Sequence, residues 1–155
     1  METQLEEFWA TFFLSMAPVV ELRGGLPYGI AQDLPYPVAL VAAVLGNMVP
    51  VPFIIVYIRR VFNALRKSSR RLRHLVERLE QRARLKSHVV NKYRYFGLFV
   101  LVAIPLPGTG AWTGALVAAF LNMRLKSAVP AIFLGVCFAA AIMTALTFGV
   151  AGYLE

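Results

Sequence analysis

Two long apolar stretches constrain the fold of this chain more than any other feature. One runs from Val38 to Ile58 and the other from Ala128 to Tyr153. At about 1.5 Å of rise per residue, roughly 20 helical residues cross a hydrocarbon core of about 30 Å, so each stretch can span a bilayer. Lipid offers the backbone no hydrogen-bond partners, and apolar segments of this length satisfy their own backbone as helices. The sequence therefore predicts an all-α integral membrane protein.

Composition and charge support this prediction and divide the chain. Hydrophobic residues make up 59% of the 155 residues and charged residues 15%, whereas soluble domains are richer in charge. The net charge is +8, and 13 of the 16 lysines and arginines lie between Arg59 and Arg94. We therefore predict one membrane domain over 1–155, made of a first half (1–58), a basic cytoplasmic helix (59–95) and a second half (96–155).

Each half begins with an apolar segment that helix-breaking residues interrupt. Phe12 to Leu34 is broken at Glu21 to Pro27, and Phe96 to Leu121 is broken at Pro105 to Gly110. A full-length span follows in both halves, and Pro50 and Pro52 are predicted to kink the first one near its far end. The two copies lie about 85 residues apart, which aligns Gly25 with Gly110 and Gly29 with Gly114. Paired interrupted segments of this kind are typical of an internal repeat around a transport site.

The distribution of charge favours broken segments that turn back instead of crossing. If Phe96 to Leu121 crossed, Arg124 and Lys126 would face the side opposite to the basic linker, which the positive-inside rule disfavours. With two re-entrant hairpins, every lysine and arginine except Arg23 falls on the cytoplasmic side. The two spans then run in opposite directions. The prediction is an inverted repeat of a re-entrant helical hairpin and a transmembrane helix, in a multi-pass protein of the cell membrane.

Two further segments are predicted to contact the membrane surface. An amphipathic helix at the N-terminus, with Thr3 and Glu6 as a capping box, is expected to lie in the interface; its apolar stripe is Leu5, Phe8, Trp9, Phe12 and Phe13. A basic helix from about Ser69 to Lys92 favours anionic lipid headgroups as partners over nucleic acid, although a solvated loop packed on the protein fits equally well. His74 and His88 lack acidic or cysteine neighbours at ligand spacing. We expect no metal and no cofactor.

The helix breaks hold the candidate binding site. A charge at the bilayer centre costs roughly 2.5 kcal/mol or more, so Glu21 and Arg23 are functional candidates. Alternatively, the two pair with each other or lie at a membrane surface. Return arms starting near Pro27 and Ala111 would point their N-termini at one anion, with Glu21 as a proton-titrating neighbour. The predicted substrate-binding residues are Glu21, Arg23, Gly24, Gly25, Pro27, Pro105, Pro107, Gly108, Thr109 and Gly110.

The two motifs also resemble a known family. Glu21-Leu22-Arg23-Gly24-Gly25-Leu26-Pro27 and Pro105-Leu106-Pro107-Gly108-Thr109-Gly110-Ala111-Trp112 look like those of the small multidrug export proteins, over nearly the whole chain. More distantly, the paired hairpins resemble the DedA superfamily, whose members are implicated in moving polyprenyl phosphate and other lipids. The resemblance implies a transport function and adds lipids to the candidate substrates. This chain has fewer intramembrane acidic and arginine residues than DedA proteins. The resemblance therefore implies a functional role for Glu21 and Arg23 only.

These observations leave three functions open. The favoured one is a transporter or flippase for an anionic amphiphile such as polyprenyl phosphate, coupled to protons or ions, since the chain has no phosphate-binding loop for ATP. The alternatives are efflux of lipophilic cationic drugs and a non-transporting scaffold that binds anionic lipid. No nucleophile or paired carboxylates predict an enzyme. Small residues on the last helix, at Gly135, Ala139, Ala140, Gly149 and Gly152, suit close packing in a homo-oligomer.

Overall fold

The computed structural model describes residues 2–71, 73–75, 77–78, 81, 93–106 and 108–154, with the side chains of 150–154 left undescribed. Within these residues the chain is helical and has no β-strand. The helices are α1 (Glu2–Met16), α2 (Glu21–Ala31), α3 (Tyr36–Met48), α4 (Pro50–Ser68), α6 (Arg94–Ala103), α7 (Ala111–Phe120) and α8 (Leu125–Leu154). Two of the described segments are long and apolar enough to cross a membrane, 36–68 and 125–149. Pro107 and residues 82–92 lie outside the described part.

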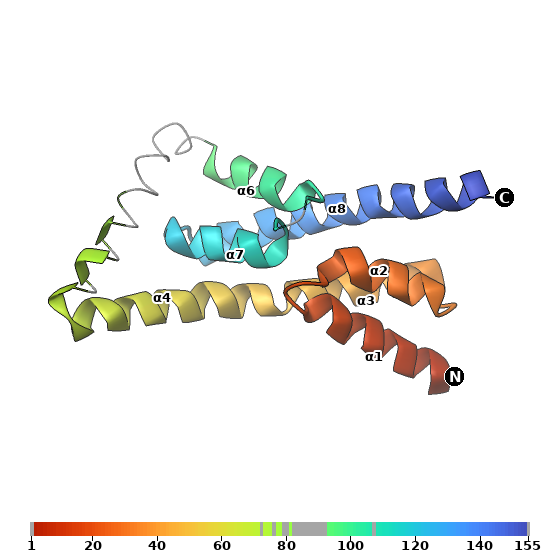
Figure 1. The fold of residues 1–155 in the computed structure, drawn as a ribbon, viewed down its shortest axis with the longest axis horizontal. Helices are drawn as coiled ribbons and strands as arrows, with labels where there is room; N and C mark the ends of the chain where they lie inside the picture. The colour runs from red at the N-terminus through yellow and green to blue at the C-terminus, as the bar shows by residue number, and fades with distance from the viewer. Residues whose placement is uncertain are drawn as a thin grey trace.

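Two helical hairpins precede the long helices. Hairpin 1 consists of α1 and α2, and hairpin 2 of α6 and α7. In Figure 1, α1 and α2 run in opposite directions, and hairpin 1 opens toward the side of the molecule where α8 ends. Hairpin 2 opens toward the opposite side. The start of α2 lies against the connection between α6 and α7 near the middle of the molecule. Because α2 packs on α8 and α7 packs on α4, each hairpin also contacts the long helix of the other half.

The break in hairpin 1 lies earlier than the sequence predicted. α1 ends at Met16 and α2 begins at Glu21, so Gly24, Gly25 and Pro27 are inside a helix. The residue overlooked is Pro18, which has no backbone N–H and disfavours helical geometry in the residue before it. The return arm therefore starts at Glu21 and not near Pro27. In hairpin 2, α6 ends at Ala103 and α7 begins at Ala111, so the break starts one residue before the predicted Pro105 and the return arm starts as predicted.

Small residues bring α1 against α2. A Cβ added to Gly25 would overlap the side chain of Ser15, and one added to Gly29 would lie 2.9 Å from the Thr11 hydroxyl. Thr11 and Ser15 are fully buried, whereas the aromatic and leucine side chains of the predicted stripe are half-buried or exposed. The stripe therefore faces outward in part, with Leu5, Trp9 and Phe13 exposed and Phe8 and Phe12 partly covered by the protein. Small residues at helix contacts and large apolar residues outside are typical of proteins in lipid.

The connections between hairpins and long helices are built alike. Asp33 and Asn122 both have positive φ, 59° and 54°, and lie 89 residues apart (from 33 to 122). Five backbone hydrogen bonds recur at this offset, among them Leu34 N to Gly29 O and Met123 N to Ala118 O. Glu21 and Gly110, at the starts of α2 and α7, also have positive φ and the same offset. The predicted offset of about 85 residues is therefore one helical turn short.

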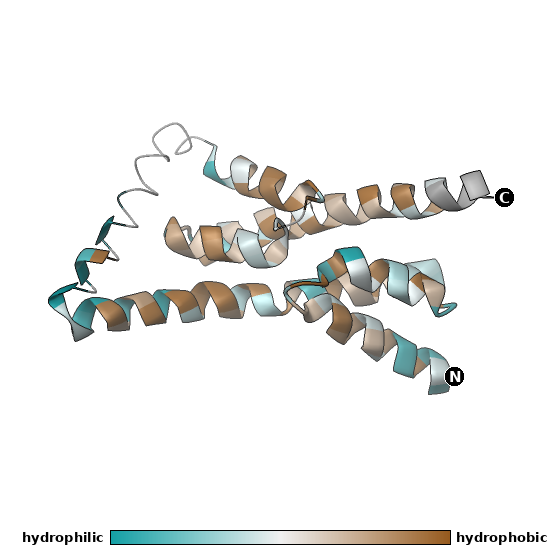
Figure 2. Cartoon of the chain, viewed as in Figure 1, coloured by the Kyte–Doolittle hydropathy of each residue, from teal (hydrophilic) through white to brown (hydrophobic). Residues whose placement is uncertain are grey.

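The long helices extend beyond the predicted spans. α3 and α4 meet at Val49, which keeps helical dihedrals, and Pro50 and Pro52 interrupt the segment near its middle instead of near its far end. Residues 59–68 of the predicted basic helix belong to α4. Beyond Ser68 the described part of the basic segment includes Glu77, which pairs with Arg73 at 3.3 Å. Figure 2 shows hydrophobic residues along the helices and hydrophilic ones past the end of α4.

Candidate functional site

The centre of the molecule is the contact between the start of α2 and the connection of hairpin 2, which we call the hairpin contact. The guanidinium of Arg23 donates hydrogen bonds to the carbonyl of Leu106, to the carbonyl of Ile104 at 3.3 Å, and to the hydroxyl of Thr109 at 2.7 Å. The Thr109 hydroxyl lies 2.8 Å from the Ile104 carbonyl and 2.7 Å from that of Leu106. Arg23 therefore holds the irregular connection of hairpin 2 on hairpin 1.

Glu21 contacts the other side of the same connection. Its side chain is 5% exposed, and Oε1 accepts a hydrogen bond at 3.3 Å from the backbone N–H of Trp112, in the first turn of α7. A helix N-terminus stabilises a carboxylate through its free N–H groups and its dipole. Within the described residues, no ion pair within 4.0 Å joins Glu21 to Arg23. Each of the two charges bonds instead to hairpin 2.

Gly110 makes this close approach possible. Its φ of 122° lies in a region that side chains rarely allow, and a Cβ there would overlap the carboxylate of Glu21. The sequence predicted that Gly110 lines the space for a substrate. In this structure the carboxylate of Glu21 takes that space. Trp112 adds a second bond, because its indole N–H donates to the Met16 carbonyl at 3.1 Å.

A small cavity of about 10 Å³ adjoins the hairpin contact and brings in a residue that sequence reasoning missed. Glu21, Gly110, Val136 and Asn47 of α3 are among its lining residues. Asn47 is 3% exposed, and its Oδ1 has no hydrogen-bond partner in the described structure. The volume is of the order needed for one water-sized particle. The signal in the sequence was an amide inside an otherwise apolar span.

The remaining predicted site residues lie in different parts of the structure. Gly24 and Gly25 face Val20 and Ser15, so they are packing positions within hairpin 1 and do not lie at the hairpin contact. Pro27 is inside α2. Pro105 and Gly108 belong to the connection of hairpin 2; Gly108 has a φ of 81°, and its carbonyl accepts a bond from the Thr113 hydroxyl at 2.9 Å. Pro107 lies outside the described residues.

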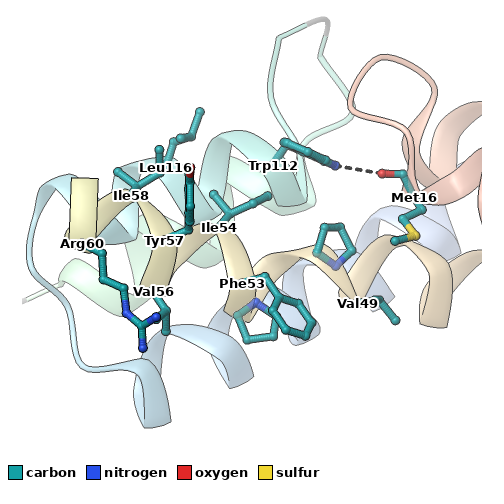
Figure 3. A pocket seen from close by; sticks show the side chains of 12 residues that line it. Met16, Val49, Phe53, Ile54, Val56, Tyr57, Ile58, Arg60, Trp112 and Leu116 are labelled. Carbon is teal, nitrogen blue, oxygen red and sulfur yellow. Dashed lines mark hydrogen bonds between the residues drawn. The ribbon is translucent and has the colours of Figure 1, made fainter. Parts of the chain in front are cut away.

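An apolar groove of about 910 Å³ runs along α4. It lies between α4 and α7, with Arg60 at one end and Met16 and Trp112 at the other (Figure 3). Arg60 is exposed and makes no hydrogen bond or ion pair with other described residues. The lining residues are Met16, Val49, Pro50, Pro52, Phe53, Ile54, Val56, Tyr57, Ile58, Arg60, Trp112 and Leu116.

Comparison with known proteins identifies the kind of protein to which this site belongs. A family model described as "Putative small multi-drug export protein" matches residues 21–142, which covers both sides of the hairpin contact. No curated protein and no solved structure matches the chain. The predicted resemblance to this family is confirmed, whereas the more distant similarity to DedA proteins stays a prediction.

Proposed function

The chain belongs to the small multi-drug export protein family, and from this premise we propose that it transports an anionic amphiphile across the cell membrane, coupled to movement of a proton or small cation. The observation that carries the proposal is the groove between α4 and α7. It is apolar along its length, has the guanidinium of Arg60 at one end, and ends at Met16 and Trp112, whose backbone N–H bonds to the buried carboxylate of Glu21. An amphiphile fits such a groove, because its apolar tail can lie along the apolar walls and its anionic head can bind a guanidinium.

The proposal includes an inverted repeat of two re-entrant hairpins. Its support is the 89-residue offset between the positive-φ pairs and between five backbone hydrogen bonds, together with the opposite directions in which the hairpins open (Figure 1). Irregular backbone is tolerated at membrane depth where protein buries it, and the carbonyls of Ile104 and Leu106 are bonded to Arg23. In alternating access, one repeat moves against the other around such a contact.

Arg23 and Glu21 have distinct roles in this mechanism. Arg23 binds carbonyls when the site is empty and exchanges them for the anionic group of the substrate, which releases the connection of hairpin 2. Glu21 takes up a proton or faces a small cation in the cavity beside Asn47, and loss of its charge weakens its bond to the Trp112 N–H. Opening of the hairpin contact would thus depend on both substrate and coupling ion.

Cysteine labelling tests the membrane arrangement. Single cysteines at Asp33, Ser69 and Ser127, in a Cys137→Ala background, are labelled with membrane-impermeant reagent from each side. We expect Asp33→Cys to react from outside and the other two from the cytoplasm. Labelling of Ser127→Cys from outside alone would mean that 94–120 crosses the membrane, and the inverted repeat would be wrong.

Reconstituted vesicles test the substrate. We expect flipping of a fluorescent polyprenyl-phosphate analogue by the wild type and a loss of at least tenfold in Leu116→Trp, which fills the groove. Leu134→Trp is the matched control, because Leu134 is 59% exposed and lies outside the groove. Activity on a lipophilic cation alone, dependent on Glu21 and indifferent to Arg23, would favour drug export. Absence of both activities in folded protein would favour a scaffold.

A further inference from the structure

A polar pocket lies at the end of α7 away from the hairpin contact. The last turns of α4 pass the connection between α7 and α8 there and enclose about 120 Å³. The lining residues are Arg59, Phe62, Asn63, Arg66, Ala119 and Asn122, and none of them is acidic. Two guanidinium groups and two carboxamides give the lining of this small pocket more hydrogen-bond donors than acceptors. The pocket is therefore suited to an anion.

Arg59 is positioned by the fold and still has a donor to offer. One guanidinium nitrogen donates to the Met123 carbonyl, which ties α4 to the connection between α7 and α8. Its Nε is buried and has no hydrogen-bond partner in the described structure. Buried donors are nearly always bonded in folded proteins, so an unbonded guanidinium N–H in a polar pocket points to a missing acceptor. The ring of Phe62 packs on Phe120 at 5.0 Å between centroids and supports the wall.

We propose that this pocket binds the phosphate group of an anionic membrane lipid. The pocket begins where the apolar part of the first long helix gives way to Arg59, at the level where lipid headgroups meet a membrane protein. Arginine guanidinium groups bind phosphate oxygens through paired N–H donors, and carboxamides add neutral donors. The site does not depend on the proposed transport function, because a lipid held here can be substrate or a permanent part of the structure.

The location of the charges distinguishes this pocket from the apolar groove. Arg60 lies at the end of the groove, whereas Arg59, Asn63 and Arg66 follow the i, i+4, i+7 spacing of one helix face turned toward Asn122. Neighbouring residues of α4 thus place one positive charge at the groove and two in the pocket. A lipid phosphate in the pocket leaves its acyl chains at the membrane-facing surface of α4.

Lipid binding to the full chain in detergent micelles tests the proposal. Native mass spectrometry counts retained phosphatidic acid against phosphatidylcholine, with inorganic phosphate added as a competitor in a separate arm. We expect Arg59→Gln to lower the affinity for phosphatidic acid about tenfold, because it loses charge-assisted hydrogen bonds, and Asn63→Leu to lower it several-fold. Lys67→Gln removes one exposed charge next to Arg66 without touching the pocket and is expected to change nothing.

Two further measurements keep the result decisive. Arg59→Gln also loses the bond to Met123, so its helicity and elution volume are compared with those of Asn63→Leu, which lies on an exposed helix face. Equal retention of phosphatidic acid by the wild type, Asn63→Leu and Lys67→Gln would overturn the proposal. Pocket-dependent binding of inorganic phosphate with no pocket-dependent binding of phosphatidic acid would overturn the assignment to lipid.

Discussion

Hairpin 1 brings charged side chains to the centre of the molecule, whereas hairpin 2 brings backbone groups. Glu21 and Arg23 stand in the first turn of α2. Opposite them, the connection of hairpin 2 offers the carbonyls of Ile104 and Leu106 to the cation, and the first turn of α7 offers the N–H of Trp112 to the anion. Both hairpins are pairs of helices joined by a short connection, yet hairpin 1 supplies the charged side chains and hairpin 2 the backbone groups that bind them.

The difference extends to how each hairpin is packed. In hairpin 1, the buried face of α1 is formed by Thr11 and Ser15, and glycines of α2 lie directly against them. In hairpin 2, Gly114 of α7 lies against the branched side chain of Val102. An irregular connection that exposes carbonyls needs a partner with donors. The close packing of hairpin 1 fixes the position of Arg23, whose guanidinium N–H groups are those donors.

The largest effect is expected from a side chain at Gly110, where the two hairpins are closest. Gly110→Val would place Cβ in the Glu21 carboxylate and hold a β-branched residue at a φ of 122°. Backbone strain and displacement of a buried charge together should cost more than about 3 kcal/mol of unfolding free energy. Thermal unfolding followed by tryptophan fluorescence measures this cost.

Gly108→Val is the control for that measurement. Gly108 also has positive φ, 81°, but an added Cβ there would meet no atom within 4 Å. Its cost should therefore be the backbone term alone, of the order of 1–3 kcal/mol. If both variants lose the same stability, Glu21 does not occupy the space beside Gly110, and our description of the hairpin contact is wrong.

The second effect in size is expected at Arg23. Arg23→Gln removes the charge that bonds the Ile104 and Leu106 carbonyls, which should cost about 2 kcal/mol, because hydrogen bonds to charged groups contribute about 1.5–3 kcal/mol. Hydrogen exchange of the amides in 104–110 should rise while that of α3 stays unchanged. Arg124→Gln, an exposed arginine outside the contact, serves as the control. Unchanged exchange in 104–110 would mean that hairpin 2 holds its shape alone.

The sequence predicted the two charges, the break in hairpin 2 and the start of α7 near them, but not which backbone groups the charges bind. Glu21 and Arg23 are visible because ionisable residues are rare and costly in apolar segments. The α-helical class, the two spans and the break at 104–110 followed from hydropathy and proline. The break in hairpin 1 was misplaced because two glycines and Pro27 carry a stronger helix-breaking signal than Pro18 alone. Close packing on Ser15 and Thr11 makes glycine favourable inside α2, and such packing is a tertiary effect.

Other parts of the contact depend on tertiary structure that no local pattern encodes. The carbonyls that bind Arg23 come from residues 81 and 83 positions away, and any residue type presents a carbonyl. Asn47 carried a weak signal as an amide in an apolar span, but its position beside Glu21 depends on how α3 packs. The predicted offset of about 85 residues was taken from matched glycines that lie one helical turn apart in each half, whereas the residues with positive φ lie 89 positions apart.

The smallest effect on stability, and the sharpest test of function, is expected for Glu21→Gln. The amide keeps an oxygen that can accept from the Trp112 N–H and removes the cost of burying a charge, so unfolding free energy should change by less than about 1 kcal/mol. Arginine stays charged at all ordinary pH values, so Glu21 is the titrating side chain that bonds across the contact. Vesicle transport by the wild type should therefore vary with pH between about 4 and 8, and transport by Glu21→Gln should be flat over that range. Glu7→Gln, on α1 and remote from the contact, is the matched control and should retain the wild-type profile. An unchanged pH profile in Glu21→Gln would remove Glu21 from the coupling mechanism and leave it as a structural bond between the two hairpins.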